Sequence, residues 1–453
     1  MIIISEEVPK SDNEINDDFF LDEEIKSLPS EEEKTENKKG LFGAISITNS
    51  TGESFFSTFF PAFAALAGLS GTLLGVITSI RNLLGSLFQG LFGRLSDKIG
   101  RKYFLFAGFT GNFIVIFLLL FYDKTIMIII VSIIQAISIS IIAPVWNASL
   151  GDITKIKERG FFIGKISALG LVISVGLQLL ITIGFYLADT VLKGRIILGW
   201  AINIPEDIQY KIIFGIAAIN YLICCFLTLT LRETKKVNTD YKIPHILDSF
   251  KDRSFRKFLI INSVNGLVMS LSWPLYPLTQ VKILAMDFWE ISIYFASFTV
   301  FIGIGQLVGG RISNRIGCKN LIAIGRISLF IFGPLWILAV FYDSWWWLLI
   351  EGVTTGFPVG LAFVGINTYV LNIAHDDLRG TYTGLMQFFW GITTFIGSFI
   401  AGIISDALTN NLGLENMAFI MFGAIAGIRL IISLGYLFID DSSSKTIVTK
   451  MSS

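Results

Sequence analysis

The chain is poor in the residues that build disulfide frameworks and metal centres. Of its 453 residues, three are cysteine and two are histidine. Cys224 and Cys225 are adjacent within an apolar run and Cys318 stands in a short polar loop, which excludes a secreted-type disulfide framework. His245 and His375 stand in separate polar loops, away from any cysteine or carboxylate cluster at metal-ligand spacing. We expect no metal and no cofactor, and because no nucleophile and base form a recognisable constellation, we expect no enzyme.

Charge is also scarce. Only 15% of the residues are Asp, Glu, Lys or Arg, whereas 53% are hydrophobic, and a soluble globule of this size needs more polar surface. Twelve apolar runs reach the roughly 20 residues that a helix needs to cross about 30 Å of hydrocarbon. These runs begin near residues 45, 72, 103, 125, 161, 211, 257, 288, 320, 345, 381 and 416. The sequence therefore predicts an all-α membrane protein with twelve transmembrane helices.

The formal net charge of zero hides an uneven distribution. Residues 1–40 hold thirteen acids and five lysines, which leaves thirty basic against twenty-two acidic residues in the rest of the chain. This acidic, apolar-poor segment is typical of a disordered tail. Residues 232–254 are polar and basic and predict a linker, and residues 441–453 predict a second polar tail.

The basic residues are concentrated in alternate loops. The loops after the second, fourth, sixth, eighth and tenth apolar runs carry most of the lysines and arginines, whereas the opposite loops carry few. Positive charges close to the spans are retained in the cytoplasm. We therefore expect a multi-pass protein of the plasma membrane with both termini, the linker 232–254 and the basic loops on the cytoplasmic side.

One charged, glycine-flanked loop occurs twice. Residues 93–102 read Gly-Arg-Leu-Ser-Asp-Lys-Ile-Gly-Arg-Lys, and residues 310–319 read Gly-Arg-Ile-Ser-Asn-Arg-Ile-Gly-Cys-Lys, with six identities in ten positions. Each copy lies between two apolar runs that are long enough to cross a bilayer. The repetition indicates a duplicated architecture in which residues 41–231 and 255–440 are equivalent halves.

The repeated loop resembles the signature of the major facilitator superfamily, which reads Gly-x-x-x-Asp-(Arg/Lys)-x-Gly-Arg-(Arg/Lys) between helices 2 and 3 and recurs in weaker form between helices 8 and 9. The first copy here is complete, whereas in the second Asn314 replaces the acid and Cys318 replaces the arginine. The resemblance implies two pseudo-symmetric six-helix bundles that rock about a central cavity near the midplane of the membrane. We expect the protein to act as a monomer in the lipid bilayer, with no nucleic-acid partner.

Other loop elements also resemble that family. Asp152 and Arg159 have the spacing of its acid-x6-arginine element between helices 4 and 5, and Arg232-Glu233-Thr234 resembles its acidic element after helix 6. Together they imply a cytoplasmic ionic latch, in which exposed pairs of roughly 0 to 1 kcal/mol each bias the two states without locking either. The residues assigned to this gate are Gly93, Asp97, Gly100, Arg101, Lys102, Asp152, Glu158, Arg159, Glu233 and Arg379.

Four ionisable side chains lie deep in predicted spans, where charge is costly and indicates a substrate or ion site. They are Glu53, Arg81, Glu351 and Arg429. Glu53 and Arg81 differ in depth by roughly 6 Å at 1.5 Å per helical residue, a gap that a long arginine side chain can close. We hypothesise that they interact, and that Glu53 takes up and releases the coupling proton when solute displaces the arginine, because burial favours the neutral carboxyl and the arginine favours the carboxylate. A permanent structural ion pair is the alternative.

The remaining site candidates are polar or aromatic. Asn265 matches Asn49 when the first and seventh spans are aligned, as Pro277 matches Pro61, and we expect these spans to be kinked helices that line the cavity. Asn147 and Asn367 occupy the ends of spans 4 and 10 and complete the predicted substrate or proton site. Aromatic cavity candidates are Phe59, Phe60, Trp273, Tyr276, Phe388, Phe389 and Trp390.

These features predict a proton-linked carrier of a small organic solute. The aromatic candidates slightly favour export of a hydrophobic compound over proton-coupled uptake of a metabolite such as an organic acid or a sugar. A membrane sensor that transports nothing, with residues 1–40 as its docking element for a partner, is the alternative from a different class. Deleting residues 1–40 separates the two, since a carrier keeps its flux and a sensor loses its output.

Overall fold

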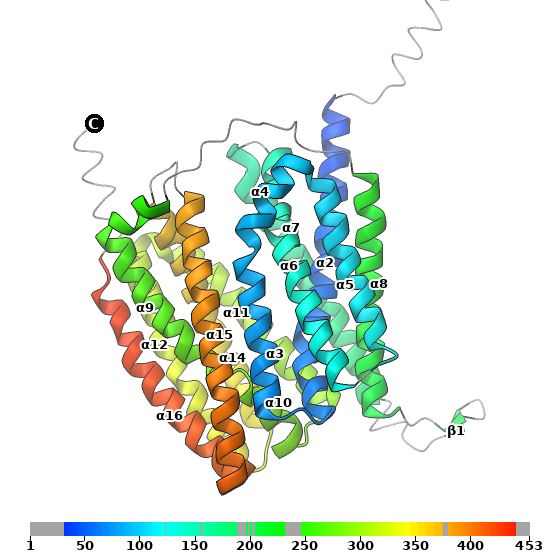
Figure 1. The fold of residues 1–453 in the computed structure, drawn as a ribbon, viewed down its shortest axis with the longest axis vertical. Helices are drawn as coiled ribbons and strands as arrows, with labels where there is room; N and C mark the ends of the chain where they lie inside the picture. The colour runs from blue at the N-terminus through cyan, green and yellow to red at the C-terminus, as the bar shows by residue number, and fades with distance from the viewer. Residues whose placement is uncertain are drawn as a thin grey trace, which may run out of the picture.

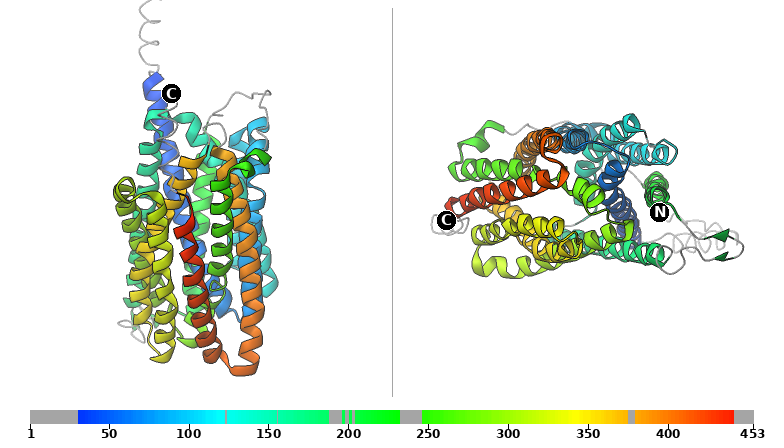
Figure 2. Two further views of the ribbon diagram at one scale, coloured as in Figure 1. Left: turned by 90° about the vertical axis from the view of Figure 1, so that its left-hand side faces the viewer. Right: turned by 90° about the horizontal axis from the view of Figure 1, so that it is seen from below.

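The computed structural model describes residues 31–122, 124–154, 156–187, 196–197, 200–201, 204–231, 246–374 and 379–440. The chain forms long helices that run along one common axis (Figures 1 and 2). Helix α2 begins at the same end of the bundle as the chain ends after α16 (Figure 1). We call this end, which includes Ile99 and Asp440, the inner end, and the end that includes Leu69 and Leu412 the outer end.

The first half of the chain builds one bundle. Helices α2 and α8 pack together, and α5 packs against both α6 and α8. The elements are α2 (Glu31–Leu66), α3 (Gly71–Leu87), α4 (Gln89–Ile99), α5 (Arg101–Leu119), α6 (Thr125–Ile153), α7 (Ile156–Tyr186), β1 (Ile196–Ile197), β2 (Trp200–Ala201) and α8 (Glu206–Thr230). The two short antiparallel strands belong to the connection between α7 and α8, which the sequence did not predict to contain a hairpin.

The second half builds the other bundle. Its elements are η2 (Ile246–Lys251), α9 (Arg253–Ser270), α10 (Leu275–Leu278), η3 (Thr279–Ile283), α11 (Phe288–Ile316), α12 (Cys318–Ser328), η4 (Leu329–Ile331), α13 (Phe332–Phe341), α14 (Trp346–Ile373), α15 (Arg379–Leu412), α16 (Leu414–Leu434) and η6 (Gly435–Phe438). Helices α11 and α14 pack closely because Gly360 brings two backbones together, so that a methyl group at this position would lie 2.2 Å from the carbonyl oxygen of Ile302.

Twelve helical spans follow from these elements, as predicted. Among the described residues, eleven helical segments are long and apolar enough to cross a membrane. The twelfth predicted span is α2, which is long enough but carries many serine, threonine and asparagine residues and Glu53. Its polarity has a physical reason, because α2 supplies polar side chains to an internal cavity. Helix α2 also extends ten residues into the segment 1–40 that was predicted to be a disordered tail, where Glu and Lys are good helix formers.

The repeated loop has the same backbone form in both halves. Gly100 has φ +119° between α4 and α5, and Gly317 has φ +80° between α11 and α12. This left-handed region is open to glycine and strained for other residues. The two glycines of the repeated motif therefore mark equivalent sharp turns at the inner end.

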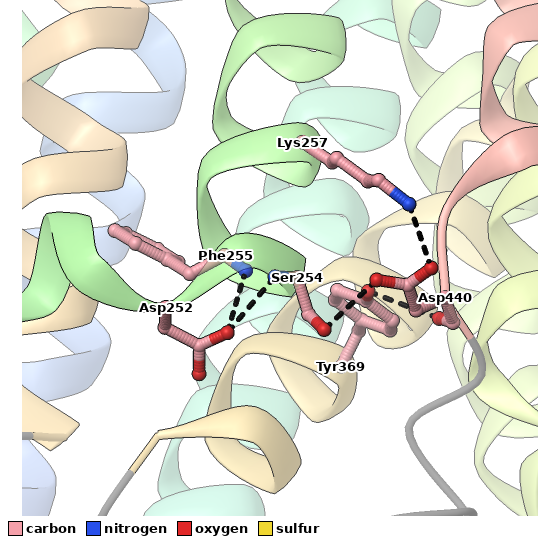
Figure 3. A network of polar contacts seen from close by, with 6 residues as sticks. All are labelled: Asp252, Ser254, Phe255, Lys257, Tyr369 and Asp440. Atoms are coloured by element: carbon pink, nitrogen blue, oxygen red, sulfur yellow. Dashed lines mark hydrogen bonds and ion pairs between the residues drawn. The ribbon is translucent and has the colours of Figure 1, made fainter.

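A polar network fastens the inner end of the second bundle (Figure 3). The Nζ of Lys257 lies 3.0 Å from Oδ1 of Asp440, and the hydroxyl of Ser254 donates to Oδ2 at 2.9 Å. The hydroxyl of Tyr369 donates to the Asp440 carbonyl oxygen at 3.0 Å. The start of α9 and the inner end of α14 are thus joined to Asp440, which follows η6, and the hydrogen bond from Lys257 holds the pKa of Asp440 below its usual range.

This network predicts a small, pH-dependent contribution to stability. Because the pKa of Asp440 is lowered in the folded state, its contribution is present above the unfolded pKa of about 3.9 and is lost as pH falls through the folded value. The Lys257 and Asp440 side chains are 39% and 41% exposed, so Asp440→Asn should cost no more than about 1 kcal/mol. At pH 7 the variant should have a lower apparent Tm than wild type, and the difference should disappear as pH falls below the folded pKa of Asp440. Equal destabilisation at both pH values, or the same loss in a Lys257→Met background, would contradict this origin.

Candidate functional site

Glu53 is the centre of a polar cluster inside the first bundle. Its Oε1 lies 2.7 Å from a guanidinium nitrogen of Arg81, so the two side chains that the sequence paired do meet. The side-chain amide of Gln135 donates to Oε2 at 3.1 Å, and the hydroxyl of Tyr221 donates to the same oxygen at 2.8 Å. Four helices, α2, α3, α6 and α8, therefore converge on one carboxylate, and the Arg81 charge neutralises it.

Sequence reasoning did not assign Gln135 and Tyr221 to this cluster. Both are buried, and each lies in a span whose other residues are mostly apolar. A buried glutamine in an apolar span is a detectable signal, because its amide requires a partner. Tyrosine carries a weaker signal, since it also occurs at membrane interfaces.

A cavity of about 280 Å³ adjoins Glu53, and we call it the inner cavity. Its polar wall combines one carboxylate with three carboxamides from α2, α5 and α6, and its apolar wall comes from α6. The lining residues are Asn49, Glu53, Asn112, Ile139, Ile142, Ala143, Trp146 and Asn147. The predicted site residue Asn147 is thus brought beside Glu53, whereas Asn112 was not anticipated. The Asn112 side chain is 0% exposed, and neither its nitrogen nor its oxygen has a partner among the described residues.

A second cavity, of about 190 Å³, lies between the two bundles, and we call it the outer cavity. It is lined by Ser57, Thr58, Pro61, Ala62, Thr78, Trp273, Tyr276, Pro277, Gln280 and Phe295. The matched prolines Pro61 and Pro277 therefore line the same cavity. Helix α2 continues through Pro61, whereas span 7 is interrupted at residues 271–274 and continues as α10 and η3.

The Glu53–Arg81 pair lies between these two cavities. Glu53 lines the inner cavity, and Ser57, one helical turn further along α2, lines the outer cavity. On α3, Thr78 lines the outer cavity and precedes Arg81 by one turn. Each partner of the ion pair therefore lies one helical turn from a residue that lines the outer cavity.

The aromatic cavity candidates differ in whether they line a cavity or pack against other side chains. Trp273 and Tyr276 line the outer cavity, as predicted. Phe59 and Phe60 are buried residues of α2, and Phe59 stacks across the bundles on Phe288 of α11 with ring centroids 4.6 Å apart. In the second bundle, the guanidinium carbon of Arg326 lies 5.3 Å from the ring centroid of Trp390. Rings also meet at the inner side, where Phe388 packs against Phe389.

Glu351 and Arg429 lie in a separate cluster inside the second bundle. The hydroxyl of Tyr294 donates to Oε2 of Glu351 at 2.9 Å, and the hydroxyl of Thr355 donates to Oε1 at 2.8 Å. Glu351 is 3% exposed, and the Arg429 guanidinium carbon lies 4.8 Å from the ring centroid of Phe332. The second bundle therefore holds a fully buried carboxylate and cation, whereas the side chains of Glu53 and Arg81 are 32% and 21% exposed.

The other two predicted asparagines are occupied elsewhere. The amide of Asn265 donates to the hydroxyl of Ser433 at 3.2 Å and is buried between α9 and α16. The amide of Asn367 donates to the carbonyl oxygen of Phe363 in its own helix at 2.8 Å. Among the described residues, neither lines the inner or the outer cavity.

The predicted gate is described only in part. Arg101 forms an ion pair with Asp152, and the Nζ of Lys102 donates to the carbonyl oxygen of Leu229 at 2.6 Å. Both contacts join helices of the first bundle, so they do not bridge the two halves in this state. Gly93 packs near Pro144 in the same bundle. The side chains of Asp97, Glu158, Arg159 and Arg379, and all of Glu233, lie outside the part of the chain that the structure describes.

Contacts between the bundles gather toward the outer end. Both carboxylate oxygens of Asp406 in α15 accept backbone N–H groups at the start of α3, from Gly71 at 2.7 Å and from Thr72 at 2.9 Å. The Nζ of Lys282 donates to the carbonyl oxygen of Leu69 at 2.9 Å. Thr182 also forms a hydrogen bond with Ser292. The outer end is therefore closed by polar contacts, none of which the sequence analysis predicted.

Glycines make this closure tight. Gly75 of α3 and Gly402 of α15 approach so closely that a methyl group on Gly75 would lie 2.6 Å from the carbonyl oxygen of Ser398. The hydroxyl of Ser79 donates to the carbonyl oxygen of Phe395 at 2.8 Å, further along the same helix pair. Small residues let two helix backbones meet in a membrane. The outer closure is thus a packed helix pair with the Asp406 carboxylate at its end.

This chain is similar to several known proteins. Over 351 residues, 76% of this chain and 83% of the relative, it is 26% identical to Multidrug resistance protein 1 of Bacillus subtilis (strain 168). Over 84 residues, 18% of each chain, it is 33% identical to the D-xylose transporter of Levilactobacillus brevis. Its fold is similar to the crystal structure of the nucleoside transporter NupG, with a TM-score of 0.68, 14% identity, and coverage of 89% of this chain and 99% of that one.

The family comparison covers most of the chain. The family model of the Major Facilitator Superfamily matches residues 42–391 and, in a second match, residues 258–452. This agrees with the repeated loop, the twelve spans and the two bundles. The chain therefore belongs to the major facilitator superfamily of membrane transporters and is not an enzyme.

Proposed function

We propose that this protein is a proton-coupled secondary transporter that exports a small amphipathic or hydrophobic solute by alternating access. The observation that carries the proposal is the Glu53–Arg81 ion pair, held at 2.7 Å between the inner and outer cavities. Glu53 is the coupling carboxylate, because a group that lines the solute cavity and pairs with a movable cation changes its protonation when that cation moves.

Export is supported by the relative that aligns with most of the chain, the multidrug resistance protein. The outer cavity also has an aromatic wall formed by Trp273, Tyr276 and Phe295, which suits an apolar solute. Proton-coupled uptake of a metabolite is the second candidate. It is favoured by the three carboxamides of the inner cavity and by the short match to the D-xylose transporter.

Reconstituted vesicles that enclose a pH-sensitive dye test the proposal. A panel of solutes is added with a pH gradient of either sign. We expect one class of solute to accumulate on one side of the membrane while protons flow down their gradient. Export predicts solute and proton flux in opposite directions, whereas uptake predicts the same direction. Solute flux without proton movement would refute coupling, and the absence of flux for every solute on the panel would favour the sensor alternative.

A further inference from the structure

The inner cavity contains a buried carboxamide that no described residue satisfies. Both side-chain polar atoms of Asn112 lack a hydrogen-bond partner among the described residues, although the side chain is 0% exposed. Leaving a buried amide unpaired is costly, so such groups generally have a partner. Asn112 belongs to the wall of the cavity of about 280 Å³, and a turn of its side chain toward the cavity would let a bound molecule supply that partner.

The charge of the cavity limits what this partner can be. Glu53, the acid in its wall, already accepts from Arg81, Gln135 and Tyr221. The remaining polar lining groups are the neutral carboxamides of Asn49, Asn112 and Asn147. A bound ion would therefore face no uncompensated opposite charge, and an ion without such a partner is expensive to desolvate. An uncharged ligand fits this wall.

The shape of the unsatisfied group specifies the ligand further. A carboxamide presents one donor and one acceptor side by side, and its complement is a group with an adjacent acceptor and donor, such as another amide. Trp146, Ile139 and Ile142 provide flat and apolar surface in the same cavity, and aromatic faces stack on planar rings.

We infer that the inner cavity is a subsite for an uncharged planar ring compound that carries an amide or lactam group, with Asn112 as its paired hydrogen-bond partner. This inference rests on the proposed transport function and names the solute class of that site. The amide is bound by Asn112, and the ring lies against Trp146 and the α6 side chains. The ring and the amide together make the solute amphipathic, which fits the aromatic wall of the outer cavity.

The test uses the purified full-length chain in detergent and isothermal titration calorimetry at pH 7, without a membrane gradient. Nicotinamide and 2-pyridone are the uncharged amide probes. Nicotinate has the same ring with a carboxylate, N,N-diethylnicotinamide has the same ring without an amide N–H, and tetraphenylphosphonium is a hydrophobic cation. We expect both amide probes to bind more tightly than the other three. Binding of neither amide, or preference for nicotinate or tetraphenylphosphonium, overturns the inference.

Variants of one residue connect binding to Asn112. Asn112→Leu removes both hydrogen bonds at similar volume and should weaken nicotinamide binding roughly 10- to 100-fold. Asn112→Asp replaces the donor with an acceptor and should weaken it as well. The matched control is Asn220→Leu in the same bundle, because the Asn220 amide already donates to the Ile216 carbonyl oxygen at 2.9 Å. Equal affinity of wild type and Asn112→Leu overturns the inference.

Two further readouts keep the interpretation clear. Without ligand, Asn112→Leu should unfold at the same temperature as wild type or higher, because an apolar group replaces an unsatisfied polar one. A lower Tm would show that Asn112 has a structural partner and would overturn the inference. Binding that persists without any proton movement in vesicles refutes the proposed coupling alone, whereas proton-coupled flux of other solutes without amide binding refutes the subsite alone.

Discussion

Replacing Glu53 with Gln is expected to abolish accumulation of solute against its gradient in reconstituted vesicles, while counterflow exchange of solute continues. If one proton is coupled to each solute, a gradient of one pH unit is worth about 1.4 kcal/mol and supports up to about a tenfold concentration ratio. Glutamine keeps the shape of the side chain and the hydrogen bonds to Gln135 and Tyr221 within reach, but it cannot exchange a proton. The variant should therefore reach a ratio near one.

The buried carboxylate of the second bundle provides the informative comparison. Glu351 lies in the other bundle with Tyr294 and Thr355, and it lines neither cavity among the described residues. We expect Glu351→Gln to retain gradient-driven accumulation. The opposite pattern, in which Glu351→Gln is uncoupled and Glu53→Gln is not, would transfer the coupling role to the second bundle and leave Glu53–Arg81 as a structural ion pair.

Replacing Asp406 with Ala is expected to open the outer end. The Asp406 carboxylate accepts two backbone N–H groups from the first turn of α3, where the helix dipole also favours negative charge. Hydrogen bonds to charged groups contribute about 1.5–3 kcal/mol each. Because Asp406 is partly exposed and water competes for it, we expect the two hydrogen bonds together to stabilise the closed outer end by about 2 kcal/mol. Their loss should shift the equilibrium roughly thirtyfold toward the outward-open state.

Labelling of a single cysteine measures this shift. Ala62 lines the outer cavity and is buried when the outer end is closed. In an Ala62→Cys protein whose native Cys224, Cys225 and Cys318 are replaced with alanine, Asp406→Ala should raise the rate of reaction with a membrane-impermeant maleimide added outside intact cells.

The matched control is an acid at the same end that does not join the bundles. Asp207 pairs with Lys211 in its own helix, α8, at 3.4 Å. Asp207→Ala should leave the labelling rate of the Ala62→Cys protein unchanged. An unchanged rate in Asp406→Ala, or an equal increase in both variants, would show that the Asp406 bonds do not hold the outer end closed.

The described ion pairs at the inner end lie within one bundle, whereas polar contacts at the outer end cross from one bundle to the other. The Arg101–Asp152 pair lies within the first bundle, and the Lys257–Asp440 pair lies within the second. At the outer end, Asp406 and Lys282 reach across from the second bundle to the first. The described contacts are those of a carrier closed at its outer end, and the inner ionic pairs are arranged to hold each bundle together in this state.

The amino-acid sequence by itself determined the class of this protein. The apolar runs were recognisable because the length of a helix must match the thickness of the membrane. The repeated loop was recognisable because glycine is favoured in turns with positive φ. The pairing of Glu53 with Arg81 was also predictable, because the depth of a charge in a helix follows from residue count.

Only the tertiary structure decided which polar side chains meet. Gln135 and Tyr221 reach Glu53 from α6 and α8, and Asp406 reaches the start of α3 more than 300 residues away in sequence. Such contacts depend on how helices rotate and pack, and residue spacing along one helix carries no information about its neighbour. Asn112 was missed for the same reason. The sequence shows a polar residue in a span, but only the packed bundle shows that it is buried in a cavity wall and that both of its polar atoms lack a partner among the described residues.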